Sequence, residues 1–91
     1  MRITEKNLEM LVESLNKITG SPLTSYTKYK SGKYKANLGN FHLDFAYGGV
    51  SLHRMQNLNG GIEDIFQKGH MTKRQLWDLM QDYIRGIQYD S

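Results

Sequence analysis

The sequence predicts an α+β domain in which two helices pack on one face of an antiparallel sheet. Apolar residues recur with helical spacing near both ends of the chain and alternate as in β-strands between them. Glycine-containing turns divide the middle segment at short intervals, which is typical of strands joined in a meander. Because each helix has one apolar stripe and the sheet has one apolar face, both helices should cover that face. The 91 residues should form one domain, residues 1–91.

The first helix is predicted over residues 4–19. Its apolar stripe consists of Leu8, Leu11, Val12, Leu15 and Ile18. Thr4 can cap the first turn through its hydroxyl group, and Ile3 can pack against Leu8 as a hydrophobic staple. Gly20 can adopt the left-handed conformation that ends many helices, so the helix should stop near Thr19.

Four strands are predicted between the helices, at residues 24–30, 33–38, 41–47 and 50–56. Gly39-Asn40 and Gly48-Gly49 are interpreted as the central pairs of two hairpin turns, where positive φ angles favour glycine. In the resulting register Phe45 faces Leu52 on the apolar side of the sheet. Phe45 is therefore predicted to be a core residue.

The opposite face of this sheet should be polar and mostly basic. Its members include Lys33, Lys35, Asn37, His42, Asp44, Ser51 and His53. The register brings His42, Asp44 and His53 together, with Asp44 between Lys35 and His53. A metal site usually needs three or four convergent ligands, and a His–Asp pair on an open sheet is more often a surface hydrogen bond. We therefore expect no metal, no cofactor and no catalytic residue, and retain these three residues as binding candidates.

The second helix should begin near Thr72, which can form a capping box with Gln75. Its apolar stripe consists of Leu76, Leu79, Met80, Tyr83, Ile84 and Ile87. Leu79 is predicted to be a core residue. The preceding residues, 57–70, are predicted to form a long loop, and loops of this length often carry function. The binding candidates in this loop are Gly60, Gly61 and Phe66.

Basic and aromatic residues gather in one stretch of the chain. No acidic residue occurs between Ser14 and Leu43, whereas this stretch contains five lysines with tyrosines among them: Lys17, Lys28, Lys30, Lys33 and Lys35, with Tyr26, Tyr29 and Tyr34. This composition can follow phosphates and stack on bases. Lysines also prevent an exposed edge strand from pairing with another chain, which is the alternative interpretation.

A second basic group, Lys73 and Arg74, lies in the first turn of the second helix. Basic residues oppose the helix macrodipole there, which hints at a nearby anion unless capping alone determines the segment. Lys33, Lys35, Lys73 and Arg74 are thus the candidate phosphate-binding residues.

Composition narrows the class of protein. A hydrophobic share of 38% supports a small core, and a net charge of +3 is compatible with an acidic partner without requiring one. No apolar run approaches the roughly 18 residues of a membrane helix, and the first residues do not resemble a signal peptide. A cytoplasmic protein with no membrane partner is expected. Without cysteine, disulfides and thiolate chemistry are excluded.

The order helix, three-stranded meander, helix, with a basic pair opening the last helix, resembles the double-stranded RNA-binding domain. Gly39-Asn40-Phe41-His42 is similar to a histidine-bearing loop of that family. Residues 67–76 keep only the two basic residues of the family's lysine-rich motif, so the similarity is one of topology.

A closer similarity covers four segments: MRITEKNLEMLVESLNKITGSP, ANLGNFHLDFAYGGVSLHRMQN, GGI and GHMTKRQLWDLMQDYIRGI. It is most specific at His42-Leu43-Asp44 and Ala46-Tyr47-Gly48-Gly49-Val50. In these segments the chain resembles a family of small uncharacterised proteins encoded by tailed bacteriophages and prophages. The resemblance implies a phage or prophage origin, and hence the cytoplasm of a bacterial host, and it implies no activity.

Two functions are predicted. The first is a non-enzymatic phage or prophage accessory protein that binds a host macromolecule, for instance to interfere with host physiology or defence. The alternative is a nucleic-acid- or nucleotide-binding module that uses the lysine- and tyrosine-rich strands together with Lys73 and Arg74. Self-association through an exposed edge strand is compatible with either function.

Overall fold

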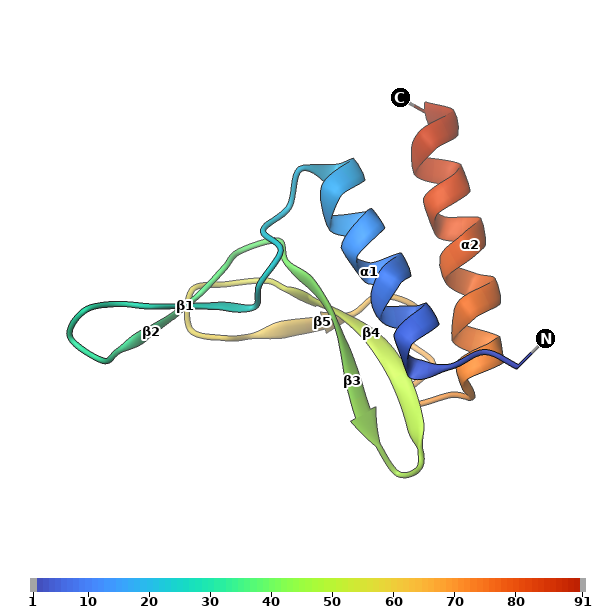
Figure 1. The fold of residues 1–91 in the computed structure, drawn as a ribbon, viewed down its shortest axis with the longest axis horizontal. Helices are drawn as coiled ribbons and strands as arrows, with labels where there is room; N and C mark the ends of the chain where they lie inside the picture. Colours follow the sequence, from blue (N-terminus) through green and yellow to red (C-terminus); the bar gives the residue numbers. More distant parts are fainter. Residues whose placement is uncertain (1, 91) are drawn as a thin grey trace.

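The computed structural model describes residues 2–90 (Figure 1). In chain order the elements are α1 (Glu5–Thr19), β1 (Tyr26–Lys28), β2 (Tyr34–Ala36), β3 (Phe41–Ala46), β4 (Gly49–Met55), β5 (Ile62–Asp64) and α2 (Lys73–Asp90). The strands form two antiparallel sheets, β1–β2 and β3–β4–β5, with β4 in the centre of the larger one. The predicted α+β class is confirmed. Neither of the two helices in this range is long and apolar enough to cross a lipid bilayer.

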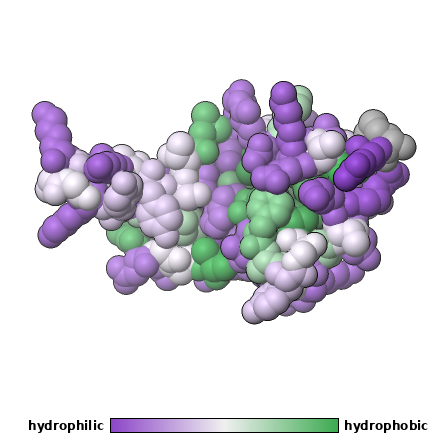
Figure 2. Space-filling view, turned by 60° about the horizontal axis from the view of Figure 1, so that its bottom comes forward, coloured by the Kyte–Doolittle hydropathy of each residue, from purple (hydrophilic) through white to green (hydrophobic). Residues whose placement is uncertain are grey.

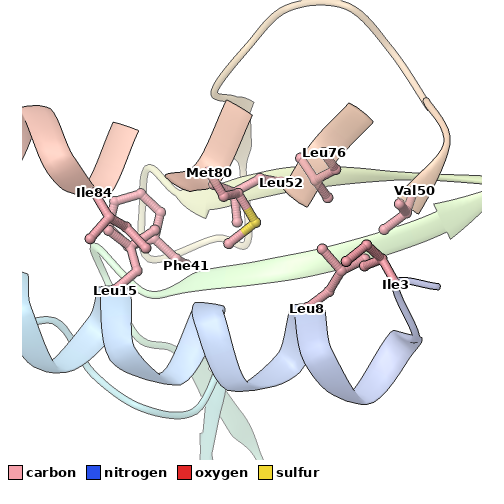
Figure 3. Packing of buried hydrophobic residues seen from close by; sticks show 9 residues of the cluster. All are labelled: Ile3, Leu8, Leu15, Phe41, Val50, Leu52, Leu76, Met80 and Ile84. Atoms are coloured by element: carbon pink, nitrogen blue, oxygen red, sulfur yellow. The ribbon is translucent and has the colours of Figure 1, made fainter. Parts of the chain in front are cut away.

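Both helices lie on the same face of the β3–β4–β5 sheet, as predicted, and both begin near the end that carries the β3–β4 turn (Figure 1). The core between helices and sheet (Figure 3) consists of Ile3, Leu8, Leu15, Phe41, Val50, Leu52, Leu76, Met80 and Ile84. Fully burying one such side chain stabilises the fold by about 1.5–3 kcal/mol. This core fixes the position of the sheet and leaves its other face free of helices.

The predicted start of each helix is confirmed by its capping contacts. The Thr4 hydroxyl accepts from the Asn7 backbone N–H at 3.2 Å, and the Asn7 side chain accepts from the Thr4 N–H at 2.9 Å. Thr72 and Gln75 make the same reciprocal pair, at 3.1 and 3.0 Å. Gly20, with φ of 68°, ends α1 in the left-handed conformation.

The β3–β4 turn lies one residue earlier than predicted. Ala46 pairs with Gly49, so the central pair is Tyr47 and Gly48, with φ of 54° and 73°. Positive φ at both positions is what the tightest hairpin turns require. Phe45 consequently faces Val50 and not Leu52. The pairing changes by two residues, which is one full pleat, so every side chain keeps its predicted face.

Phe45 and Leu79 are not core residues, contrary to the prediction. Phe45 belongs to the helix-covered face but lies beside the turn, beyond the start of both helices, and is 46% exposed. On α2 the buried side chains are Leu76, Met80 and Ile84, which follow one another every four residues. Leu79 lies beside this line and is half-buried.

The predicted hairpin at Gly39-Asn40 is wrong, because β2 does not pair with β3. Gly39, with φ of 87°, donates its N–H to the Met55 carbonyl, and the Met55 N–H donates to the Asn40 carbonyl, both at 2.9 Å. Two residues thus face one, which is a β-bulge that bends the strand away from the sheet. The β1–β2 hairpin is therefore a separate projection from the body (Figure 1).

The segment before α2 contains a strand that the sequence analysis did not predict. In β5, Asp64 pairs with His53 of β4. Farther along, Met71 forms a bridge to Val50 through two backbone hydrogen bonds of 2.9 Å each. Residues 57–70 are therefore attached to the sheet over part of their length, and their path brings the start of α2 beside β4.

Candidate functional site

All three histidines of the chain lie together on the side of the sheet away from the helices. We call His42, Asp44, Ser51, His53 and His70 the histidine face. His42 is directly opposite His53, and Asp44 is opposite Ser51. The ring centroids of His42 and His53 are 5.9 Å apart, and those of His53 and His70 are 6.3 Å apart. The predicted grouping of His42, Asp44 and His53 on one face is confirmed.

His70 is the member of this face that sequence reasoning missed. Its Nε2 lies 2.7 Å from Oδ2 of Asp44. The backbone bridge between Met71 and Val50 places His70 beside the central strand, from which its side chain reaches Asp44 on the far neighbour, β3. Twenty-six residues separate the two partners. The sequence shows no periodicity at His70 that would have revealed the contact.

Ser51 and His53 form a second hydrogen-bonded pair, with Ser51 Oγ 2.9 Å from His53 Nε2. A hydroxyl beside an imidazole is the arrangement of a nucleophile and its base. Ser51, however, is fully buried and His53 is 8% exposed. A substrate therefore has no access to the Ser51 hydroxyl, and we interpret this pair as the means by which the central strand satisfies its polar side chains.

Two side chains of the histidine face, His42 and Asp44, have pKa values shifted by their surroundings. Burial, followed by the nearby His53, lowers the pKa of His42 below its ordinary value of 6.5, which favours neutral imidazole. The hydrogen bond from His70 lowers the pKa of Asp44 below 3.8, which favours the carboxylate. Within residues 2–90 no three histidine or acidic side chains are placed to hold a metal ion.

The second candidate site is the hairpin arm, residues 26–36. Tyr26 pairs with Ala36, and Lys28 pairs with Tyr34. Because side chains alternate along a strand, each face of the arm combines tyrosine with lysine. One face has Tyr26, Lys28 and Tyr34, and the other has Tyr29, Lys33 and Lys35. Lys33 and Lys35 thus lie on the arm and not beside Asp44, where the predicted register placed them.

The hairpin arm carries the positive excess of the whole chain. It contains four of the twelve basic residues, Lys28, Lys30, Lys33 and Lys35, and none of the nine acidic ones. The rest of the chain therefore has eight basic and nine acidic residues, close to neutrality. All four lysines are exposed, and the three tyrosines of the arm are between 47% and 65% exposed. Hydrophilic side chains project from the arm at the left of Figure 2.

Gly60, Gly61 and Phe66, the candidates from the 57–70 segment, make packing contacts. Gly60 has φ of 88°, and a Cβ atom there would lie 2.9 Å from the Tyr26 hydroxyl. The Gly61 N–H donates to the Asn57 side chain at 2.9 Å. The Phe66 ring packs edge-on against Tyr83 of α2, with centroids 5.7 Å apart. The turn at Gly60 therefore supports the base of the arm.

Lys73 and Arg74 are far from the arm, because α2 begins at the opposite end of the molecule (Figure 1). Arg74 Nε lies 3.4 Å from Asp78 Oδ1, one helical turn away. Lys73 lines a pocket at the β3–β4 turn. The two basic groups of the sequence therefore do not form one phosphate-binding surface.

Comparisons with known proteins provide no identification. No protein-family model matches the chain, and neither the curated proteins nor the solved structures include a significant match. The phage or prophage relationship stays a prediction from sequence.

Proposed function

We propose that this protein acts by binding and that the hairpin arm binds single-stranded nucleic acid. The observation that carries the proposal is the arm itself, which projects from a nearly neutral body and holds the positive excess of the chain. Four lysines on a strand pair can follow a phosphate backbone, and the electrostatic attraction is independent of base sequence.

The tyrosines support a single-stranded ligand. Tyr34 is 65% exposed, and the Lys28 ammonium lies 5.8 Å from the centroid of its ring. A half-exposed ring beside an ammonium group can stack on an unpaired base while the lysine neutralises the adjacent phosphate. Lysine is a flexible point charge and lacks the rigid fork with which arginine reads a base edge. Binding should therefore show little sequence preference.

The architecture of the arm supports a role in recognition. A two-stranded hairpin without a third strand or a helix above it is only marginally stable in water. All three residues of β1 are exposed, and only Ala36 of β2 is buried. Because the arm contributes so little to the core, we infer that its role is to contact another molecule.

Catalysis receives less support from the histidine face. Its Ser51 hydroxyl is inaccessible, and its His70 and Asp44 side chains bind each other. A phage or prophage accessory protein that binds host nucleic acid would agree with the resemblance seen in the sequence.

A matched pair of tyrosine variants tests the proposal. The probe is a short fluorescein-labelled oligo-dT, titrated with protein at low salt and followed by fluorescence anisotropy. Tyr34→Ala should weaken binding roughly 5- to 150-fold, because one stacked base contributes about 1–3 kcal/mol. Tyr89→Ala removes an even more accessible ring, 89% exposed, from α2 and should leave the affinity unchanged. Equal affinities for the wild type and both variants would contradict the proposal.

The alternative role of the lysines predicts a different outcome. If they only keep the strands of the arm from pairing with other chains, replacing Lys33 and Lys35 by alanine should promote aggregation. The wild type should then show no saturable binding of the oligonucleotide.

A further inference from the structure

The outer edge of β3 has backbone groups to which the described residues offer no partner. Val50 exchanges both of its backbone hydrogen bonds with Met71, so it makes none with Phe45 opposite it. In an antiparallel ladder the bonded and non-bonded pairs alternate. The N–H and C=O groups of Leu43 and Phe45 therefore point away from β4. No backbone or side-chain group within residues 2–90 bonds them.

The stretch of unpaired backbone groups on β3 ends where α1 contacts this strand. At Phe41 the outward N–H and C=O groups are both bonded by the Asn16 side chain, at 2.8 and 3.0 Å. Farther along, at Leu43 and Phe45, none of the described side chains makes such a contact. Neither lysine nor proline occurs in β3, although these are the residues with which natural sheets protect an exposed edge.

A pocket of about 590 Å³ lies beside the open edge. Its apolar lining includes Ile3, Phe45, Val50 and Met71, and Lys73 lies at its α2 side. None of the described residues that line it is acidic. Figure 2 turns this end of the molecule toward the reader and shows a green apolar patch with purple hydrophilic residues around it. The next aromatic residue along the turn, Tyr47, is 98% exposed.

We propose that this edge and pocket bind an extended, acidic segment of a partner protein by strand addition. The segment's backbone pairs with Leu43 and Phe45, which satisfies their four outward groups. One apolar side chain enters the pocket beside Phe45. To reach Lys73, the segment must continue from the edge of β3 across β4. Strands lie about 4.8 Å apart and an extended chain rises about 3.3 Å per residue, so about three to five further residues cover this path. An aspartate or glutamate at that distance complements the Lys73 ammonium.

A second copy of this chain fits the edge less well. Antiparallel pairing of two β3 strands through Leu43 and Phe45 would place the two Asp44 carboxylates opposite each other, which is destabilising. Shifting the centre of pairing to Leu43 would require the outward groups of Phe41, which Asn16 already occupies. A partner of different sequence avoids both conflicts.

Selection from a ribosome-displayed library of short random peptides on the full-length protein tests this inference. The peptides that are enriched should have an alternating apolar stretch followed, three to five residues later, by an acidic residue. The two best peptides are then synthesised, and their affinities for wild-type and variant proteins are measured by titration calorimetry. A selection that enriches no such pattern would overturn the inference.

Two substitutions at one position isolate the backbone contact. Phe45→Ala removes the ring and keeps the outward N–H, whereas Phe45→Pro removes both and leaves the β4 hydrogen bonds intact. Phe45→Pro should bind the peptides roughly tenfold more weakly than Phe45→Ala, the effect of one well-formed hydrogen bond. Equal affinities of these two variants would contradict strand addition.

Two further measurements apply even if Phe45→Pro fails to fold. Peptide binding to the wild type should slow hydrogen exchange at the Leu43 and Phe45 amides, and unchanged exchange there would overturn the inference. Lys73→Glu should lower the affinity for the acidic peptides and raise the affinity for versions that have lysine in place of the acidic residue. Concentration-dependent dimerisation of the wild type that Phe45→Pro abolishes would instead assign the edge to a second copy.

Discussion

The side-chain amide of Asn16 occupies the place of a neighbouring strand at Phe41. Asn16 Nδ2 donates to the Phe41 carbonyl at 3.0 Å, and the Phe41 N–H donates to Asn16 Oδ1 at 2.8 Å. Both residues are about 1% exposed. One buried amide thus joins α1 to the sheet edge and satisfies two backbone groups that would otherwise be orphaned.

We expect Asn16→Leu to lower the free energy of unfolding by about 2–6 kcal/mol, because two buried backbone groups lose their partner at about 1–3 kcal/mol each. Urea denaturation followed by circular dichroism measures the change. The exposed Ser14, on the outer face of α1, provides the control, and Ser14→Ala should change stability by no more than about 0.5 kcal/mol. Similar stabilities of the two variants would show that the Asn16–Phe41 pair contributes little.

The turn residue Tyr47 is held at φ of 54°, a conformation that costs most L-residues about 1–2 kcal/mol. Its side chain is 98% exposed, so little packing offsets the cost. We expect Tyr47→Asn to raise the free energy of unfolding by about 0.5–1 kcal/mol, since asparagine tolerates this conformation. A thermal melt tests this. A clear loss of stability would mean that the edge-on contact between Tyr47 and His70 matters more than the strain.

The pH dependence of stability should report on His42. Burial and His53 lower its pKa in the folded state, so below the ordinary value of 6.5 the unfolded chain binds a proton that the folded chain does not. Stability should therefore fall as the pH decreases from about 7 toward the folded-state pKa. The other groups that act on His42 are Asp44, which opposes the shift, and the backbone of Asn40. In His42→Gln the decline should be shallower, and an unchanged slope in urea midpoints across this range would refute the assignment.

The support of the arm by the 57–70 segment can be tested at Gly60. Gly60→Ala combines a strained φ of 88° with a contact of 2.9 Å to the Tyr26 hydroxyl, so it should destabilise the protein by more than about 1–2 kcal/mol. Gly69 has φ of 69° and no neighbour within 4 Å of a Cβ atom, which makes Gly69→Ala the matched control for strain alone. Only Gly60→Ala should also weaken oligonucleotide binding. Equal effects of both variants on binding would show that the turn at Gly60 does not support the arm.

Helix boundaries could be predicted from the sequence because their determinants are local. Thr4 and Asn7, or Thr72 and Gln75, are three residues apart and interact with each other's backbone. The shared face of His42, Asp44 and His53 was also predictable, because strand alternation survives an even shift of register. The exact turn was not, since Gly48-Gly49 is the better hairpin pair by propensity and the ladder nevertheless places Tyr47 in it.

The features of the fold and of the site that could not be predicted from the sequence depend on contacts between distant segments. Phe45 alternates like a core residue, but its burial depends on where the helices begin above it. The separation of the arm depends on the bulge at Gly39, where Asn40 also binds Ser25 and Pro22 through its side chain. His70 reaches Asp44 because of the bridge between Met71 and Val50, which no local sequence pattern predicts. Such contacts are tertiary, and periodicity contains no information about them.

The salt dependence of oligonucleotide binding tests the central claim most directly. The affinity of the wild type for a labelled oligo-dT should fall linearly on a plot of log K against log salt, because bound counterions are released. Replacing Lys33 and Lys35 by alanine should weaken binding and reduce the slope by roughly 1.4, about 0.7 for each lost contact with a single strand. Lys6 and Lys68 are exposed lysines outside the arm, and replacing both should leave affinity and slope unchanged. If both double variants bind with the wild-type slope, or reduce it equally, the hairpin arm is not the nucleic-acid-binding site.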